Sequence, residues 1–179
     1  MTVRKAPPRK RRCGLSEKQL CRMALDKGAL GARVIAPRTV TTGGWVRWKC
    51  QFGCGAFRSN LMCPPHSPAP AETRGMLDEY RRAVLFESPP GRAKRIAAAL
   101  ERDLFLAGYY KAFGLGAGPC DLCESCALDK GCRHPEDARP AMEACGIDVF
   151  ATARRHGFTI EVVRRPDDPQ HYFGLVLIA

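Results

Sequence analysis

The chain has 179 residues, a formal net charge of +11 and 45% hydrophobic residues, so it has enough apolar side chains to bury a core without disulfide cross-links. It contains ten cysteines but no apolar segment of the kind that spans a bilayer or directs secretion. We therefore expect a cytoplasmic protein with no membrane partner. In that reducing compartment, clustered cysteines are metal ligands more often than disulfides.

The positive charge is concentrated at the N-terminus. Six of the 29 basic residues lie in the first twelve positions, without an acidic residue among them, which leaves 23 basic against 18 acidic residues in the rest. We expect residues 1–14 to form a disordered basic arm and residues 15–179 to form a single α+β metal-binding domain. Nucleic acid would be contacted only through the arm, and a solvated terminus is the simpler interpretation.

The N-terminal half of the chain alternates short elements with irregular segments. A capping box of serine and glutamine opens a helix predicted over residues 16–28. Residues 32–36 predict a short strand that ends at a proline. Residues 39–48 are predicted to be extended or hairpin-like, and residues 50–70, rich in Gly, Pro and Ser, to be a loop.

Regular structure then resumes. We predict a helix over residues 71–81, a buried strand over 82–87 and the longest helix over 92–113, where apolar residues recur on one face. The glycine-rich residues 114–118 are predicted to form a flexible hinge.

The C-terminal part adds two short helices, predicted over residues 136–144 and 148–155, and two strands, predicted over 158–163 and 172–178. The sum is an α+β fold: a small, mainly antiparallel sheet with helices packed on one side and two cysteine-rich metal-binding loops.

The second of these loops, residues 120–132, carries the strongest chemical signal. Its thiols, Cys120, Cys123, Cys126 and Cys132, follow the pattern Cys-x₂-Cys-x₂-Cys and then Cys-Arg-His-Pro. Such a run wraps one loop around an iron–sulfur core. Nearby glycines let backbone N–H groups face the sulfides, and a proline after the last cysteine gives the loop a rigid exit. Zinc is the alternative, but structural zinc usually takes two separate ligand pairs. We predict a 4Fe–4S cluster here.

The first loop, residues 50–63, has the pattern Cys-x₃-Cys-x₈-Cys and supplies Cys50, Cys54 and Cys63. These thiols indicate a second metal site, a second cluster by ligand count, whose fourth ligand is proposed to be Cys145. Other candidates for the fourth position are His66, Cys13, Cys21 and solvent. A trio that is merely buried, or bound to zinc, is the alternative interpretation.

Several motifs occur together in a specific order: Cys-x₃-Cys-x₈-Cys-Pro-Pro-x-Ser-Pro, Tyr-Arg-Arg-Ala-Val-Leu, Gly-x-Cys-x₂-Cys-x₂-Cys and Met-Glu-Ala-Cys-Gly-Ile-Asp-Val. Together they resemble a family of predicted metal-binding proteins, domain of unknown function 2284, over roughly residues 30–179. The resemblance implies a prokaryotic cytoplasmic protein. It also implies one metal set in the second loop and part of another in the first.

Three functions compete. The first is an iron–sulfur protein that passes electrons to a redox partner protein and is not an independent enzyme. The second is a zinc-stabilised module that recognises protein or nucleic acid. The third is a small enzyme with an open iron at the first loop.

Overall fold

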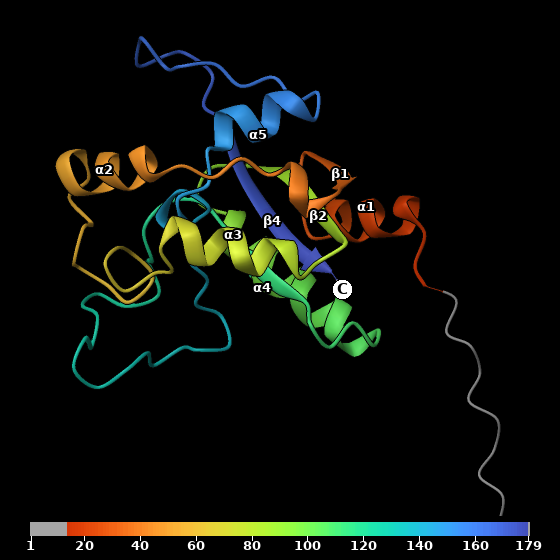
Figure 1. Ribbon diagram of the computed structural model, residues 1–179, viewed down its shortest axis with the longest axis horizontal. Coiled ribbons are helices and arrows are strands. Elements are labelled where there is room, and N and C mark those ends of the chain that lie inside the picture. Colours follow the sequence, from red (N-terminus) through yellow and green to blue (C-terminus); the bar gives the residue numbers. More distant parts are fainter. Residues whose placement is uncertain (1–13, 179) are drawn as a thin grey trace, which may run out of the picture.

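The computed structural model describes residues 14–178, which contain one four-stranded sheet (Figure 1). The strands are β1 (Gly31–Ile35), β2 (Arg82–Ser88), β3 (Phe113–Leu115) and β4 (Tyr172–Ile178). Their spatial order is β1-β2-β4-β3, and each neighbouring pair is antiparallel. The predicted α+β class with a mainly antiparallel sheet is confirmed. The predicted basic arm lies, except for its last residue, outside the described residues.

Helices α1 (Glu17–Asp26) and α4 (Ala93–Leu106) cover one face of the sheet (Figure 1). Successive residues of a strand point to opposite faces, and Val84 and Phe86 of β2 point toward these two helices. They pack with Val176 of β4, which lies opposite Val84 in the register. These contacts form an apolar cluster between the sheet and the two helices.

The second face packs against a different group of helices. Leu85 of β2 and Leu175 of β4, which are partners in the register, contact this layer. It is formed by α3 (Pro70–Asp78), α5 (Val149–Arg155) and the 3₁₀ helix η2 (Glu143–Cys145). Helices therefore lie on both faces, and the prediction of helices on one side only is wrong.

Local sequence explains the two well-predicted helices of the first layer. Ser16 caps α1: its hydroxyl oxygen accepts from the Gln19 backbone N–H, while the Gln19 side chain accepts from the Ser16 N–H. In α4, Ile96, Leu100 and Leu104 recur at helical spacing and are buried against the sheet. No helix within residues 14–178 is long and apolar enough to cross a membrane.

Residues 36–54 differ from the prediction. A 3₁₀ turn, η1 (Pro37–Thr39), follows β1, and α2 (Gly44–Gly53) occupies much of the segment predicted to be extended. The glycine pair that suggested a hairpin is the start of this helix, with Gly43 as its N-cap. Only Val46 of α2 is buried, so α2 lies beside the sheet layers rather than between them (Figure 1).

The predicted glycine hinge is also wrong, because part of it forms β3. Gly114 packs so closely on α4 that a Cβ atom would lie 3.0 Å from the Ala97 carbonyl oxygen. The Gly114 N–H donates to Glu101 Oε2 of α4 at 2.7 Å. These glycines serve close packing against α4, and helix α4 itself ends at Leu106 rather than near residue 113.

Two further predicted elements are absent from the described residues. Residues 136–142 are irregular instead of helical, because Gly116 exchanges backbone hydrogen bonds with Pro140 and Met142. Residues 158–163 form no strand, although Phe158 stacks edge-on against Phe173 with ring centroids 5.2 Å apart. The alternation of apolar and polar residues in this segment reflects the burial of Ile160 and the partial burial of Phe158, but the segment pairs with no strand among the described residues.

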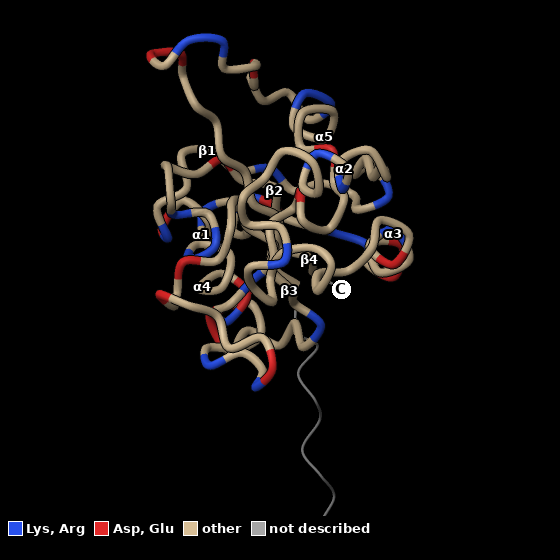
Figure 2. The backbone as a smooth tube through the Cα atoms, turned by 90° about the vertical axis from the view of Figure 1, so that its left-hand side faces the viewer, with Lys and Arg blue, Asp and Glu red and all other residues tan. Residues whose placement is uncertain are grey.

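Basic and acidic positions are scattered over the described backbone and are separated by long stretches of uncharged residues (Figure 2). Both signs occur in α3 and in residues 164–168, which follow α5. The described part of the chain thus presents a mixed-charge surface in this view.

Candidate metal centre

The second cysteine loop encloses a cavity. Cys120, Cys123, Cys126 and Cys132 all line one space of about 340 Å³, and each is half-buried. Residues 59–62, from the first loop, form the opposite wall. The cavity is therefore built by both loops.

Hydrogen bonding at this cavity suits thiolate sulfur. The backbone N–H of His134 donates to Cys132 Sγ at 3.4 Å, and His134 also lines the cavity. Such N–H donors stabilise negative charge on a metal-bound sulfur. The donor set of this loop, four thiols and a backbone N–H, fits a soft metal or an iron–sulfur core.

Lys94 holds the start of the second loop from the first turn of α4. Its ammonium donates to the Gly118 carbonyl at 2.5 Å and to the Pro119 carbonyl. Lys94 is only 8% exposed, and burial lowers its pKa, while the negative charges of Cys120 and Asp121 favour its protonated form. A buried cation thus stands beside the first thiol of the loop.

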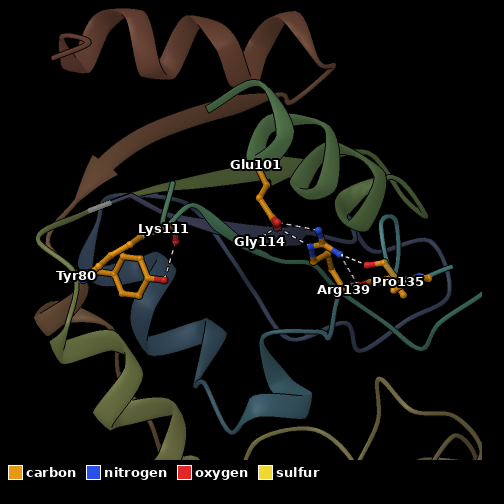
Figure 3. Close-up of polar contacts among 7 residues, drawn as sticks. Tyr80, Glu101, Lys111, Gly114, Pro135 and Arg139 are labelled. Atoms are coloured by element: carbon orange, nitrogen blue, oxygen red, sulfur yellow. Dashed lines mark hydrogen bonds and ion pairs between the residues drawn. The ribbon is translucent and has the colours of Figure 1, made fainter. Parts of the chain in front are cut away.

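Arg139 holds the other end. It forms a bidentate ion pair with Glu101 of α4, in which Nε donates to Oε2 at 2.6 Å and Nη2 donates to Oε1 at 2.8 Å (Figure 3). Arg139 Nη1 also donates to the Pro135 carbonyl at 3.0 Å, just beyond Cys132. The two side chains are only 12% and 15% exposed. Helix α4 therefore fixes both ends of the second loop.

The first loop forms a smaller cavity of about 130 Å³. Cys50 in the last turn of α2, Cys54 just after that helix and Cys63 all line it. Burial raises the pKa of Cys50, and the charges of Cys54, Glu143 and Cys63 raise it further. The three thiols predicted as ligands thus line one small cavity, and their role as ligands stays a prediction.

Arg47 lies one helical turn before Cys50 and on the same face of α2. Its Nη1 donates to the carbonyls of Ser67, Pro68 and Ala144, at 3.1, 2.8 and 3.0 Å. Because these carbonyl oxygens carry no formal charge, they do not neutralise the guanidinium, and its positive charge remains at the site. That charge also favours the thiolate form of Cys50 and so acts to lower its pKa.

Glu143 is a site residue that the sequence reasoning missed. It lies on η2 and lines the cavity of Cys50, Cys54 and Cys63. Its Oε2 atom is buried and has no hydrogen-bond partner among the described residues. Burial raises the pKa of Glu143, against the opposing effects of its own backbone N–H and of Lys94. The acid within Met-Glu-Ala-Cys-Gly was the available signal.

Cys145, the proposed fourth ligand, is placed elsewhere. It has no exposed surface and packs in the apolar layer with Leu77 and Met142. Burial raises the pKa of its thiol to about 12. Cys145 lines neither of the two cysteine cavities.

The two cavities are neighbours. Gly118 and Pro119, which precede Cys120, line the first cavity, and residues 60–62, which precede Cys63, line the second. The charges of Cys63 and Cys120, one thiol from each loop, both act to raise the pKa of Lys94. In Figure 1 the two loops lie on the same side of the sheet.

A larger cavity of about 880 Å³ adjoins the first site. Cys50, Cys54 and Glu143 form part of its wall, together with aromatic residues that include Trp45 and Phe150. The first site thus borders a space within the size range of small-molecule sites in proteins.

All nine cysteines within residues 14–178 are free thiols. In the same range, no three side chains of His, Cys, Asp or Glu converge tightly enough to hold one metal ion. The predicted ligand sets stay predictions, and what the structure adds is their grouping around two adjoining cavities.

Comparison with known proteins gives a family but no individual relative. No curated protein and no solved structure matches the chain. Residues 33–178, most of the chain and both cysteine loops, match the family described as predicted metal-binding protein, DUF2284. The chain therefore belongs to the DUF2284 family of predicted metal-binding proteins.

Proposed function

We propose that this metal-binding protein is an iron–sulfur protein, with a 4Fe–4S cluster held by Cys120, Cys123, Cys126 and Cys132. The observation that carries the proposal is that all four thiols line one cavity of about 340 Å³. A single zinc ion bound at about 2.3 Å brings its four sulfurs to within about 3.8 Å of one another. A cubane core, with its irons and sulfides, needs the wider separation that a cavity of this size allows.

A second metal centre at Cys50, Cys54 and Cys63 would complete an electron path. Each cavity is lined partly by residues next to the other cysteine loop, and the charges of Cys63 and Cys120 both favour the protonated form of Lys94. A bound cluster supplies one-electron reduction and oxidation. The protein supplies the buried cation Lys94 and the half-buried cation Arg47, which would offset the negative charge that thiolates and an added electron bring.

An exposed aromatic ridge supports docking of a redox partner protein beside this path. Trp45, Trp48 and Phe52 of α2 are 48%, 67% and 80% exposed. They follow one another at spacings of three and four residues, so they lie along one helix face. Exposed aromatic patches of this kind mark protein–protein contacts. A cytoplasmic location would keep the free thiols available for metal.

Metal analysis tests the proposal. The protein is purified without oxygen, and iron, zinc and acid-labile sulfide are measured, with electron paramagnetic resonance of the reduced form. We expect iron and sulfide in equal amounts, and their loss from the second loop in Cys123→Ser. Cys21→Ser is the matched control, because Cys21 lies on α1 and lines neither cysteine cavity. A colourless protein with stoichiometric zinc and no sulfide refutes the cluster.

A second candidate, an enzyme with an open iron at the first site, is favoured by the cavity of about 880 Å³ that Cys50 and Cys54 border. An exogenous ligand such as cyanide should then shift the resonance of the first centre. An unchanged spectrum at saturating cyanide removes this candidate.

A further inference from the structure

We propose that Glu143, and not Cys145, supplies the fourth protein ligand of the metal site formed by Cys50, Cys54 and Cys63. The proposal rests on the proposed metal function and deepens it by completing the donor set of the first loop. The carboxylate oxygen Oε2 is the atom that would bind.

The unsatisfied oxygen is the first argument. A buried carboxylate oxygen normally has hydrogen-bond partners, because leaving it without one is costly. Oε2 of Glu143 is buried and has none among the described residues, and Glu143 lines the same cavity as the three thiols. Carboxylate oxygens bind both zinc and iron, so a metal ion in this cavity would satisfy the atom.

The geometry of η2 is the second argument. A 3₁₀ helix has three residues per turn, so residues two positions apart point in directions about 120° apart. Glu143 and Cys145 stand at that spacing, and only one of them faces a given cavity. Glu143 lines the cysteine cavity, whereas Cys145 is fully buried in the apolar layer against the sheet.

Side chains close in sequence to Cys50 and Cys63 fix the orientation of η2. The carbonyl of Ala144, between the two candidates, accepts from Arg47 Nη1 at 3.0 Å and from Ser67 Oγ at 2.7 Å. Arg47 is on the helix that carries Cys50, and Ser67 follows Cys63 by four residues. The bonds that organise the thiols therefore also hold η2 with Glu143 toward them.

A carboxylate ligand changes the chemistry of the site. Oxygen is a harder donor than thiolate and suits exchange with an incoming ligand better. Glu143, Cys50 and Cys54 also border the larger cavity, so the carboxylate lies on the side from which a small molecule would approach. The first centre is thereby distinguished from the all-cysteine second centre.

X-ray absorption at the bound metal tests the proposal. The full chain with Cys123→Ser and Cys126→Ser is reconstituted with Fe²⁺ and sulfide, and separately with Zn²⁺ alone, so that the signal comes from the first loop. We expect one oxygen neighbour at about 2.0–2.2 Å besides the sulfurs. Glu143→Gln should remove it and weaken Zn²⁺ binding by about tenfold or more. Cys145→Ala should leave metal content and spectrum unchanged.

The outcomes separate this inference from the proposed function. If only zinc binds and the oxygen neighbour disappears in Glu143→Gln, the cluster fails while the ligand assignment stands. The assignment is overturned by an all-sulfur shell that loses a sulfur in Cys145→Ala, or by a first loop that binds neither metal. Circular dichroism of each variant, and the same absorption measurement on the chain with all cysteines intact, exclude misfolding as the cause.

Discussion

The Arg139–Glu101 pair offers a direct test of how α4 supports the second cysteine loop. The change is Arg139→Met, which keeps an apolar side chain of similar length but removes the guanidinium. It deletes the two bonds to Glu101, at 2.6 and 2.8 Å, and the bond to the Pro135 carbonyl. Glu101 is then left as a half-buried carboxylate whose remaining hydrogen-bond donor, among residues 14–178, is the N–H of Gly114.

The expected loss follows from burial. Because the two side chains are 12% and 15% exposed, removing one partner leaves an uncompensated charge in a poorly solvated place. Breaking such a pair costs about 3–5 kcal/mol. In a protein of this size each kcal/mol shifts the melting temperature by about 2–4 °C, so we expect a decrease of about 6–20 °C. Replacing both partners with methionine should recover part of the loss.

The free energy of unfolding is measured by urea denaturation of the metal-free protein under reducing conditions, followed by circular dichroism. Arg22→Met is the matched control, because its pair with Asp26 is 74% and 56% exposed and is worth about 0–1 kcal/mol. Arg139→Met should also release metal from the second loop more readily. A stability within about 1 kcal/mol of the control variant refutes the reasoning.

Three other predictions follow from single contacts. Lys94→Met should lower the reduction potential of the bound centre, measured by redox titration, because a cation beside Cys120 is lost. Gly174→Ala should destabilise the protein by about 1–3 kcal/mol or more in thermal unfolding, since the added Cβ would lie 2.3 Å from the Phe86 ring. Gly75→Ala, at an exposed position of α3, should stabilise it by about 0.5–1 kcal/mol in the same assay. Burial lowers the pKa of His156 below 6.5, so the unfolded chain binds that proton more readily. Stability should therefore fall as pH drops below about 6.5, and His156→Gln should flatten that part of the melting-temperature profile.

The elements that the sequence predicts well are those whose signals are local. The capping residues of α1 and the apolar stripe of α4 are contained within each helix, and both predicted helices begin within one residue of the observed start. Strands β2 and β4 are buried apolar runs bounded by turn residues, and both were also expected. Short-range periodicity is sufficient in these cases.

The elements that were missed depend on contacts distant in sequence. Strand β3 pairs with β4 some sixty residues away and is a glycine-rich segment that resembles a hinge until α4 is packed on it. Helix α2 is marked only by the spacing of Trp45, Trp48 and Phe52, and those residues face solvent instead of a core. Local propensity carries no information about the strand with which β3 pairs, nor about the exposure of the aromatic residues of α2.

The same division applies to the candidate site. The cysteine spacings indicated both thiol groups, because a loop that wraps a metal must repeat its ligands at short intervals. The cation Lys94 and the acid Glu143 come from other parts of the chain. Lys94 belongs to no cysteine motif, and Glu143 stands in the motif Met-Glu-Ala-Cys-Gly, next to the more conspicuous Cys145. Cysteine spacing favours Cys145 as the fourth ligand, whereas the turn of η2 brings Glu143 to the wall of the cavity and buries Cys145 in the apolar layer.

Charge explains why the two loops have to be built around helix α4. In the proposed metal centres, thiolates gathered in two neighbouring cavities would repel one another, and an added electron would increase that repulsion. Lys94 at the start of α4 acts on thiols of both loops, and Glu101 further along the same helix anchors Arg139 at the end of the second loop. A Cβ atom on Gly116 would lie 2.5 Å from Lys94 Cγ, so glycine is required there for the chain to pass the helix. The helix that completes the apolar core thus also sets the position and the electrostatic balance of the proposed metal loops.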